Sequence, residues 1–225
     1  MKLHFHPVST SSRPVVLLCM EANIPVEMNV IDLMTGAHMK EDFLKLNPSG
    51  QVPVLEDGDF VLCESSAILK YLADKVDSPT YPKDLKQRAK VNERMDWFNT
   101  SFGREFAYNM IYPQLFPHHA RKGEAQQHTI EWGRDKCEQQ WFKVLDEKFI
   151  GKNKFVCGDS ITIADYFGAE MIASGDLVGV SLKKFPNVDR WMQTMRALPS
   201  WKKVNEATDG FAASLKGKPF VSIGA

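Results

Sequence analysis

The sequence has no surplus of charge of either sign, because 28 Lys and Arg residues balance 28 Asp and Glu residues. A nucleic-acid or lipid-headgroup surface usually needs a basic surplus, so the balance disfavours both partners. The longest apolar stretch, residues 15–20, is too short to span a bilayer, and residues 1–6 lack the apolar core of a signal peptide. We therefore expect a cytoplasmic protein with no membrane and no nucleic-acid partner, which binds a small molecule or another subunit.

Cysteine is sparse and scattered. Cys19, Cys63, Cys137 and Cys157 have neither Cys-x-x-Cys nor metal-ligand spacing. Each lies in an apolar stretch, where buried thiols are common. We expect a structural role for all four cysteines and no bound metal.

The first 76 residues alternate between strand and helix patterns. We predict strands at residues 2–6 and 26–31, helices at 13–21 and 40–46, a hairpin over 54–62 and a helix from Ser65. The order β-α-β-α-β-β-α is typical of a sheet with helices on its faces. Residues 77–85 are polar and rich in turn formers, which predicts a linker.

Beyond the linker the apolar residues repeat with a helical period. One stripe consists of Val91, Met95, Phe98, Phe102, Phe106 and Met110, and either Pro113 or Pro117 ends its helix. Further helices are predicted at residues 124–149, 187–196 and 201–207, and the tail from Lys216 should be irregular. Thr162 and Asp165 have the spacing of a capping box at a helix start. Residues 86–225 therefore read as an all-α domain.

The stretch from Asn47 to Ser66 resembles a site for an extended, acidic ligand. Pro53 has no amide hydrogen, so it should interrupt the ladder at a sheet edge and leave the backbone of Val52 free to pair with a ligand. Glu64 and Ser65 precede a helix, whose first amide hydrogens can bind a carboxylate. A helix cap, a first-turn acid and a strand-opening proline would explain the same residues without a ligand.

A Val-Pro before the third strand, a Glu-Ser at the next helix and an all-helical second domain together resemble the cytosolic glutathione transferases. Residues 30–38 (VIDLMTGAH) and 81–85 (YPKDL) are similar to the theta class and related serine-type enzymes. The resemblance covers essentially the whole chain. It implies a thioredoxin-like α/β domain at residues 1–76, a helical domain at 86–225 that contributes the electrophile pocket, and a homodimer.

The resemblance also implies glutathione as co-substrate. Glu64 and Ser65 would hold its γ-glutamyl end. Val52 would pair with the cysteinyl backbone, next to Pro53 in the cis form.

For the glycyl carboxylate, the resemblance implies His38 and Gln51. Gln51 departs from the lysine that is frequent in theta enzymes, so it offers a hydrogen bond without charge and the affinity should be modest. His38 could instead be a solvated loop histidine, and both interpretations stay open.

Residues 7–12 form a hydroxyl-rich loop, which in this fold lies beside the sulfur of the ligand. A free thiol titrates near pH 8.5, and a hydroxyl that donates to the sulfur lowers its pKa, helped by the positive end of the next helix. The resemblance aligns Arg13, expected to be structural, with the arginine that follows the catalytic loop in theta and delta enzymes. This alignment implies Ser9 as the hydroxyl, with Thr10 or Ser11 in reserve. Ser11 or Ser12 should cap the helix. The first strand lacks tyrosine and the loop lacks cysteine, which disfavours the tyrosine-type and thiol-transferase branches.

The second substrate of this family binds between the domains, so Phe102, Phe106 and Met110 are candidates for its pocket, although such residues are more often plain core. Asp165 should act in stability and not in chemistry. The predicted function is attack by glutathione thiolate on an electrophilic carbon, through substitution, addition or dehalogenation. A non-catalytic glutathione-binding protein of the same fold and a glutathione-dependent peroxidase or reductase are the alternatives.

Overall fold

The N-terminal part is built on a four-stranded sheet, and the computed structural model describes residues 1–224 of the chain. The strands are β1 (Lys2–Phe5), β2 (Glu27–Val30), β3 (Val54–Asp57) and β4 (Phe60–Cys63), in the spatial order β2-β1-β3-β4. β1 runs parallel to β2 and antiparallel to β3, and β3 and β4 form the expected hairpin. The element order β-α-β-α-β-β-α is confirmed.

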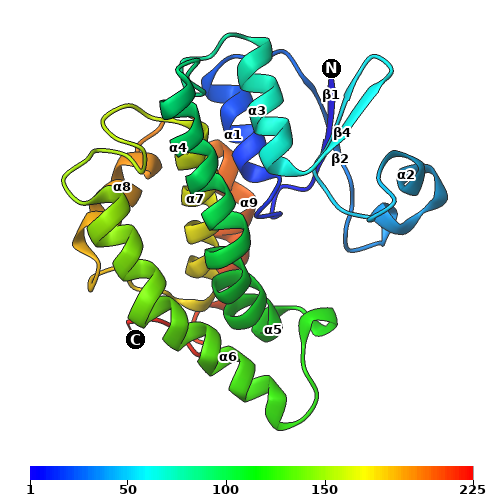
Figure 1. Cartoon of the computed structure of the whole chain (residues 1–225). Helices are drawn as coiled ribbons and strands as arrows, with labels where there is room; N and C mark the ends of the chain where they lie inside the picture. The colour runs from blue at the N-terminus through cyan, green and yellow to red at the C-terminus, as the bar shows by residue number, and fades with distance from the viewer. Residues whose placement is uncertain (225) are drawn as a thin grey trace.

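Helices cover both faces of this sheet. α1 (Arg13–Glu21) and α3 (Ser65–Lys75) lie on one side, and the short α2 (Glu41–Leu46) lies on the other (Figure 1). Because successive side chains of a strand point to opposite faces, Leu3 packs into the core with α1 and α3, whereas His4 meets Phe43 of α2 edge to face.

The helical part begins with one continuous helix over residues 85–115. It comprises α4 (Leu85–Asp96), two π-helical stretches, η2 (Trp97–Phe102) and η3 (Arg104–Ile111), and α5 (Tyr112–Leu115). A second long helix starts as α6 (Glu124–Lys136) and continues through η5 (Cys137–Trp141) and η6 (Val144–Ile150). The bundle is completed by α7 (Ile163–Ala173), α8 (Pro186–Arg196) and α9 (Trp201–Leu215).

The structure decides where one helix ends and shows that another is longer than the sequence predicts. Pro113 does not stop its helix, because it follows a π-helical stretch at which the hydrogen-bond register changes, and the helix ends before Pro117. α9 runs to Leu215 and not to Ala207. Its buried face continues through Thr208 to Leu215, and this packing outweighs the turn signal of Asp209-Gly210.

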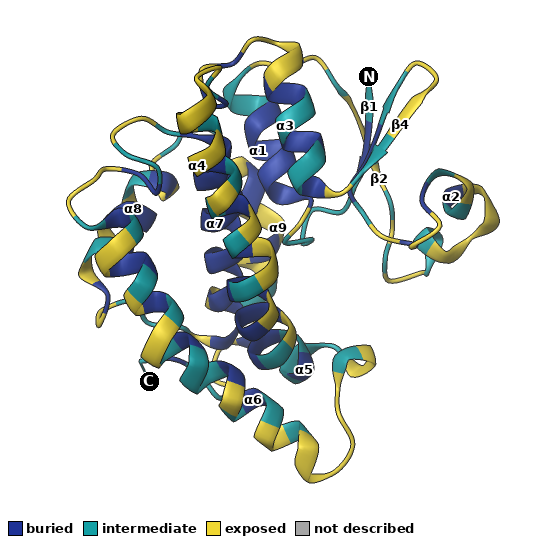
Figure 2. Cartoon of the chain, viewed as in Figure 1, coloured by how far each residue is buried: buried dark blue, intermediate teal, exposed yellow. Residues whose placement is uncertain are grey.

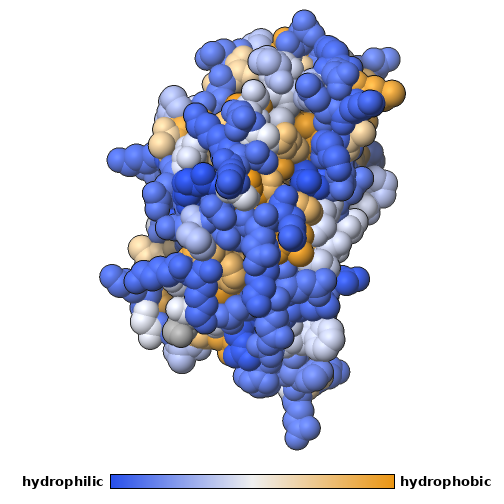
Figure 3. Space-filling view, turned by 60° about the vertical axis from the view of Figure 1, so that its left-hand side comes forward, coloured by the Kyte–Doolittle hydropathy of each residue, from blue (hydrophilic) through white to orange (hydrophobic). Residues whose placement is uncertain are grey.

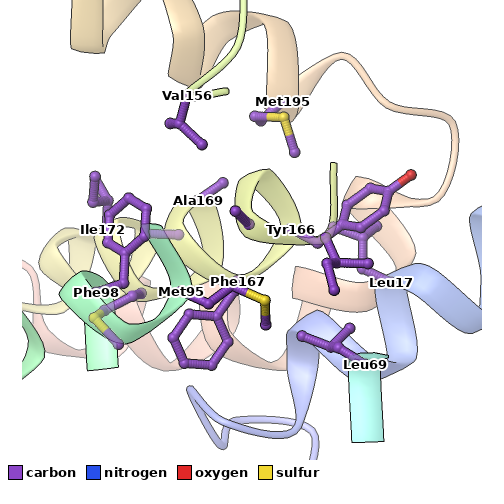
Figure 4. Packing of buried hydrophobic residues seen from close by; sticks show 14 of the residues in the cluster. Leu17, Leu69, Met95, Phe98, Val156, Tyr166, Phe167, Ala169, Ile172 and Met195 are labelled. Carbon is purple, nitrogen blue, oxygen red and sulfur yellow. The ribbon is translucent and has the colours of Figure 1, made fainter. Parts of the chain in front are cut away.

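The core is organised around α7, in which every residue is buried (Figure 2). Figure 4 shows Leu17 of α1, Leu69 of α3, Met95 and Phe98 of the long helix and Met195 of α8 gathered around it. The helix begins with the predicted capping box of Thr162 and Asp165. The Asp165 carboxylate also accepts hydrogen bonds from the Val156 amide and the Trp191 indole, at 2.9 and 3.0 Å. The Thr162 amide and hydroxyl donate to it as well, both at 2.8 Å. Burial raises the pKa of Asp165 to about 6, against these four hydrogen bonds, which lower it.

The outer surface is largely polar. Figure 3 shows hydrophilic side chains over most of one face, with smaller hydrophobic areas between them. Within residues 1–224, no helix is both long and apolar enough to cross a membrane.

Candidate functional site

The loop between β1 and α1 orients the Ser9 hydroxyl. The Ser9 oxygen accepts a hydrogen bond from the Ser12 amide at 3.2 Å, and the Ser9 carbonyl accepts from the Ser12 and Arg13 amides at 3.1 Å. Because Oγ acts as an acceptor here, its own hydrogen remains available for a ligand. The start of α1, nine residues long, adds the positive end of a helix beside it.

The expected capping serine is corrected by this arrangement. Ser12 occupies the N-cap position, but its side chain makes no capping hydrogen bond, and Ser11 is exposed. The Ser12 hydroxyl is buried and accepts from the His6 amide at 3.5 Å. Ser9 binds the amide of the N-cap residue itself, so the expected side-chain cap inside the first turn of α1 is absent.

Thr10, the reserve candidate, turns toward the helical domain. Burial raises the pKa of Tyr112 on α5, and a hydrogen bond between its phenol and the Thr10 hydroxyl opposes this. Of the loop hydroxyls, Ser9 thus combines an anchored oxygen with a free hydrogen.

Hydrogen bonds of Asn47 and a close contact of Gly50 hold the loop before β3. Asn47 donates from Nδ2 to the Gln51 carbonyl at 2.8 Å and accepts from the Ser49 amide at 3.0 Å. Gly50 has φ of +60°, and a Cβ there would lie 2.8 Å from the Met39 sulfur and 3.3 Å from the His38 carbonyl. Because glycine permits this close approach, η1 (Ala37–Met39), which carries His38, lies beside Gly50 and therefore near Gln51.

The backbone around Val52 and Glu64 has two unusual features. The Val52-Pro53 bond is cis, as the resemblance implies. Glu64, between β4 and α3, has φ of +68° and ψ of 114°, which no glycine or asparagine in the sequence announced. A non-glycine residue in such a region costs about 1–3 kcal/mol and often marks a ligand site. Ser65 is buried at the start of α3, and in the described chain no side chain caps this helix.

His6, His38 and Asp32 lie close together after the ends of β1 and β2. The parallel pairing of β1 with β2 brings His6 near Asp32, whose carboxylate accepts from the Met34 amide at 2.8 Å. Burial and the neighbouring His38 lower the pKa of His6, whereas Asp32 raises it. The Nδ1 atom of His38 is buried without a hydrogen-bond partner in residues 1–224.

The three candidates for the electrophile pocket lie in the core. Phe102, Phe106 and Met110 have 0 % exposed surface, and both phenylalanines pack against Phe142 at 5.2 and 5.5 Å. A side chain without exposed surface cannot line an open pocket. The other side of the same helix presents Tyr108, which is 47 % exposed.

An aromatic group at this helix end was missed from the sequence. Tyr108, Tyr112 and Phe116 follow one another at intervals of four residues, which is the signal that could have found them. Neighbouring rings meet edge to face, with centroids 5.1 and 5.6 Å apart. The contact of Tyr112 with Thr10 joins this group to the Ser9 loop.

Below the Ser9 loop, Arg13 connects three helices. Its guanidinium lies 2.8 Å from the Glu170 carboxylate of α7 and donates to the Glu170 carbonyl at 3.1 Å and to the Asn205 side chain of α9. Asn205 in turn donates to the Glu170 carboxylate at 2.9 Å. Both ionic groups are fully buried, so Arg13 is a structural link between the two parts of the chain.

The four cysteines are buried or half-buried. All four are free thiols, and burial raises the pKa of Cys19 and of Cys157 to about 12. Across residues 1–224, no group of three His, Cys, Asp or Glu side chains is placed to hold a metal ion.

Comparisons with known proteins agree in both parts of the chain. The family model described as "Glutathione S-transferase, N-terminal domain" matches residues 8–75, and "Glutathione S-transferase, C-terminal domain" matches residues 122–199. The human glutathione S-transferase theta-2B is 32% identical over 92% of this chain and 85% of its own length. Glutathione S-transferase 2 of Anopheles gambiae is 32% identical over 88% of this chain and 90% of its own.

Solved structures give the same result. A delta-class glutathione transferase of Nilaparvata lugens superimposes with a TM-score of 0.80 at 32% identity, over 96% of this chain and 98% of its own. Human glutathione transferase theta-2, in complex with glutathione and an unknown ligand, superimposes with a TM-score of 0.80 at 27% identity, over 98% of this chain and 92% of its own.

Proposed function

The chain belongs to the glutathione S-transferase family and is a glutathione transferase, and on that premise we propose that Ser9 activates the thiol of bound glutathione. The observation that carries this proposal is the Ser9 oxygen, which is anchored by the Ser12 amide and keeps its own hydrogen free at the start of α1. A hydroxyl that donates to the sulfur stabilises the thiolate over the thiol and so lowers its pKa.

The energetics suffice for activation near neutral pH. A pKa lowered by about 2 from the free value near 8.5 corresponds to roughly 2.7 kcal/mol. A hydrogen bond to a charged group contributes about 1.5–3 kcal/mol, and the helix end adds about 0.3–1 kcal/mol. Serine is adequate because it donates a hydrogen bond and does not itself attack.

Glutathione would be held at three points. We assign the γ-glutamyl carboxylate to the Ser65 amide and hydroxyl at the open start of α3, with Glu64 facing the ammonium group. The cysteinyl backbone would pair with Val52, which precedes the ladder of β3. The glycyl carboxylate would lie near His38, with its unpartnered Nδ1, and Gln51.

In the reaction, the thiolate attacks an electrophilic carbon and a C–S bond forms. In substitution or dehalogenation the leaving group departs with the bonding electron pair. In an addition reaction, the atom next to the attacked carbon takes up a proton instead. The electrophile would lie against Tyr108, Tyr112 and Phe116, because this aromatic group, with an exposed Tyr108, meets the Ser9 loop through Thr10. We place the pocket there and not at Phe102, Phe106 and Met110.

Glutathione binding tests the proposal directly. In calorimetry the natural protein should bind glutathione, and the ultraviolet absorbance of the complex should report a thiolate near neutral pH. Ser65→Ala should weaken binding about tenfold, because it removes a hydrogen bond to a carboxylate. Ser66→Ala is the matched control and should bind normally. Binding that is absent in the natural protein, or equal in both variants, would contradict the assignment.

We also propose a two-fold homodimer formed through β4. This strand is an edge of the described sheet, and its Phe60 and Val61 are 45 % and 38 % exposed. Exposed apolar edges are usually covered in native proteins. In sedimentation velocity the natural protein should be dimeric and Phe60→Glu monomeric. Met34→Glu changes an apolar residue that is 88 % exposed elsewhere, so it should stay dimeric. A natural protein that remains monomeric at all concentrations would refute this assembly.

A further inference from the structure

Histidine rings extend the aromatic group beyond α5. The ring of His119, in the turn η4 (Pro117–His119), lies 5.5 Å from Tyr108 and 5.2 Å from Tyr112. His118 stacks beside Phe116 at 5.9 Å and touches His119 at 4.4 Å. Tyr108, Tyr112, Phe116, His118 and His119 thus form one set of flat rings, which we call the aromatic surface.

This surface lies on the side of the molecule where glutathione is proposed to bind. The loop after α5 projects on the same side as α2 (Figure 1), and the Tyr112 phenol meets Thr10, the residue after Ser9. A substrate that reacts at a sulfur near Ser9 can therefore extend across these rings.

Arg121 supplies a positive charge beside the aromatic surface. Within residues 1–224 the Arg121 guanidinium donates only to the His119 carbonyl, at 3.3 Å, and pairs with no carboxylate. Burial lowers the pKa of His119, and the neighbouring His118 and Arg121 lower it further. The neutral imidazole of His119 still offers an N–H donor. A free cation and hydrogen-bond donors thus border a set of aromatic rings.

The loop that carries these groups is fixed to the helix before it. Gln126 of α6 accepts from the Arg121 amide at 2.6 Å and donates to the Pro113 carbonyl of α5 at 2.6 Å. Gln126 therefore holds the backbone of Arg121 near the end of α5, and the Arg121 side chain is exposed. The loop backbone needs little further ordering when a ligand binds.

We propose that the preferred electrophiles of this enzyme are flat aromatic molecules that carry an anionic group, with the ring on the aromatic surface and the anion toward Arg121 and His119. The inference rests on the proposed function and names the substrate class of its second site. Aromatic rings stack favourably on such side chains, and a guanidinium forms its strongest hydrogen bonds with carboxylates and similar anions. The anionic group itself takes no part in the bond changes at the sulfur.

Two glutathione conjugates separate this inference from the proposed function. The first, S-benzylglutathione, carries a neutral ring. The second, S-(4-carboxybenzyl)glutathione, differs from it only by a carboxylate at the para position of that ring. In calorimetry the natural protein should bind the carboxylate about fivefold more tightly, as expected of one partly exposed charge-assisted hydrogen bond. Arg121→Gln should reduce this ratio to about one while the affinity for S-benzylglutathione stays the same.

Two control variants guard against nonspecific charge effects. Lys152→Gln removes one exposed positive charge elsewhere, and His128→Asn removes an exposed histidine of α6, so both should keep the fivefold ratio. His119→Asn should lower it. If the natural protein binds both conjugates equally, or if Lys152→Gln lowers the ratio as much as Arg121→Gln, the inference is wrong and the proposed function stands. If it binds neither conjugate, the proposed function fails and the inference falls with it.

Discussion

Ser9→Ala is expected to raise the pKa of the bound glutathione thiol toward its free value of about 8.5 and to lower kcat/KM near pH 6.5 about a hundredfold. The natural site favours the thiolate because the Ser9 hydroxyl donates to the sulfur, and alanine cannot donate. The loss should be largest below the free pKa, where the thiol in the variant stays protonated, and should vanish above it. A pH profile of kcat/KM together with ultraviolet titration of the bound thiol measures both quantities.

Two checks make this result specific. Ser11→Ala removes an exposed hydroxyl from the same loop and should keep the natural profile. Because Ser9 also accepts from the Ser12 amide, Ser9→Ala should lose about 1 kcal/mol of stability, which urea unfolding measures separately. A thiolate that persists at neutral pH in Ser9→Ala would show that another group, with Thr10 first to be examined, supplies the hydrogen bond.

Arg13→Met is expected to lower the free energy of unfolding by about 3–5 kcal/mol, the usual cost of leaving one partner of a buried ion pair alone. In the natural protein the Arg13 guanidinium lies 2.8 Å from the Glu170 carboxylate, and both side chains are almost fully removed from water. Methionine fills much of the arginine volume, so the loss reports the unpaired carboxylate more than a cavity. Urea unfolding followed by tryptophan fluorescence gives the value.

The double variant Arg13→Met, Glu170→Leu should recover more than half of this loss, because neither partner then leaves an isolated buried charge. Arg196→Met is the matched control. This variant breaks the ion pair between Arg196 and Asp176, whose side chains are 44% and 39% exposed. It should lower the free energy of unfolding by less than about 1 kcal/mol. Additive losses in the double variant would mean that Arg13 and Glu170 stabilise the fold independently of each other.

Features with local signals could be predicted from the sequence. The order of strands and helices follows from short-range periodicity, and the capping box of Thr162 and Asp165 is written within four residues. Such features depend on neighbours in the chain, so the sequence displays them. The cis bond before Pro53 came from the family resemblance, because most Val-Pro bonds are trans.

Features that depend on distant residues were not predictable. Nothing near Arg13 announces that its partners stand at positions 170 and 205, because that pairing exists only once α1, α7 and α9 meet. The positive φ of Glu64, which lies between β4 and α3, has no local cause in the sequence. Phe102 and Tyr108 both lie in one aromatic-rich helix, and only the fold decides which of them is core and which is exposed.

The central position of α7 has a consequence for protein engineering. Its side chains meet α1 and α3 of the N-terminal domain as closely as they meet α4 and α8 of the helical domain. A chimera that joins this N-terminal domain to the helices of a relative must therefore bring α7 residues shaped to the surfaces of α1 and α3. A chimera that is simply joined at the domain boundary would leave the contacts of α7 with α1 and α3 mismatched, because the two domains share one hydrophobic core.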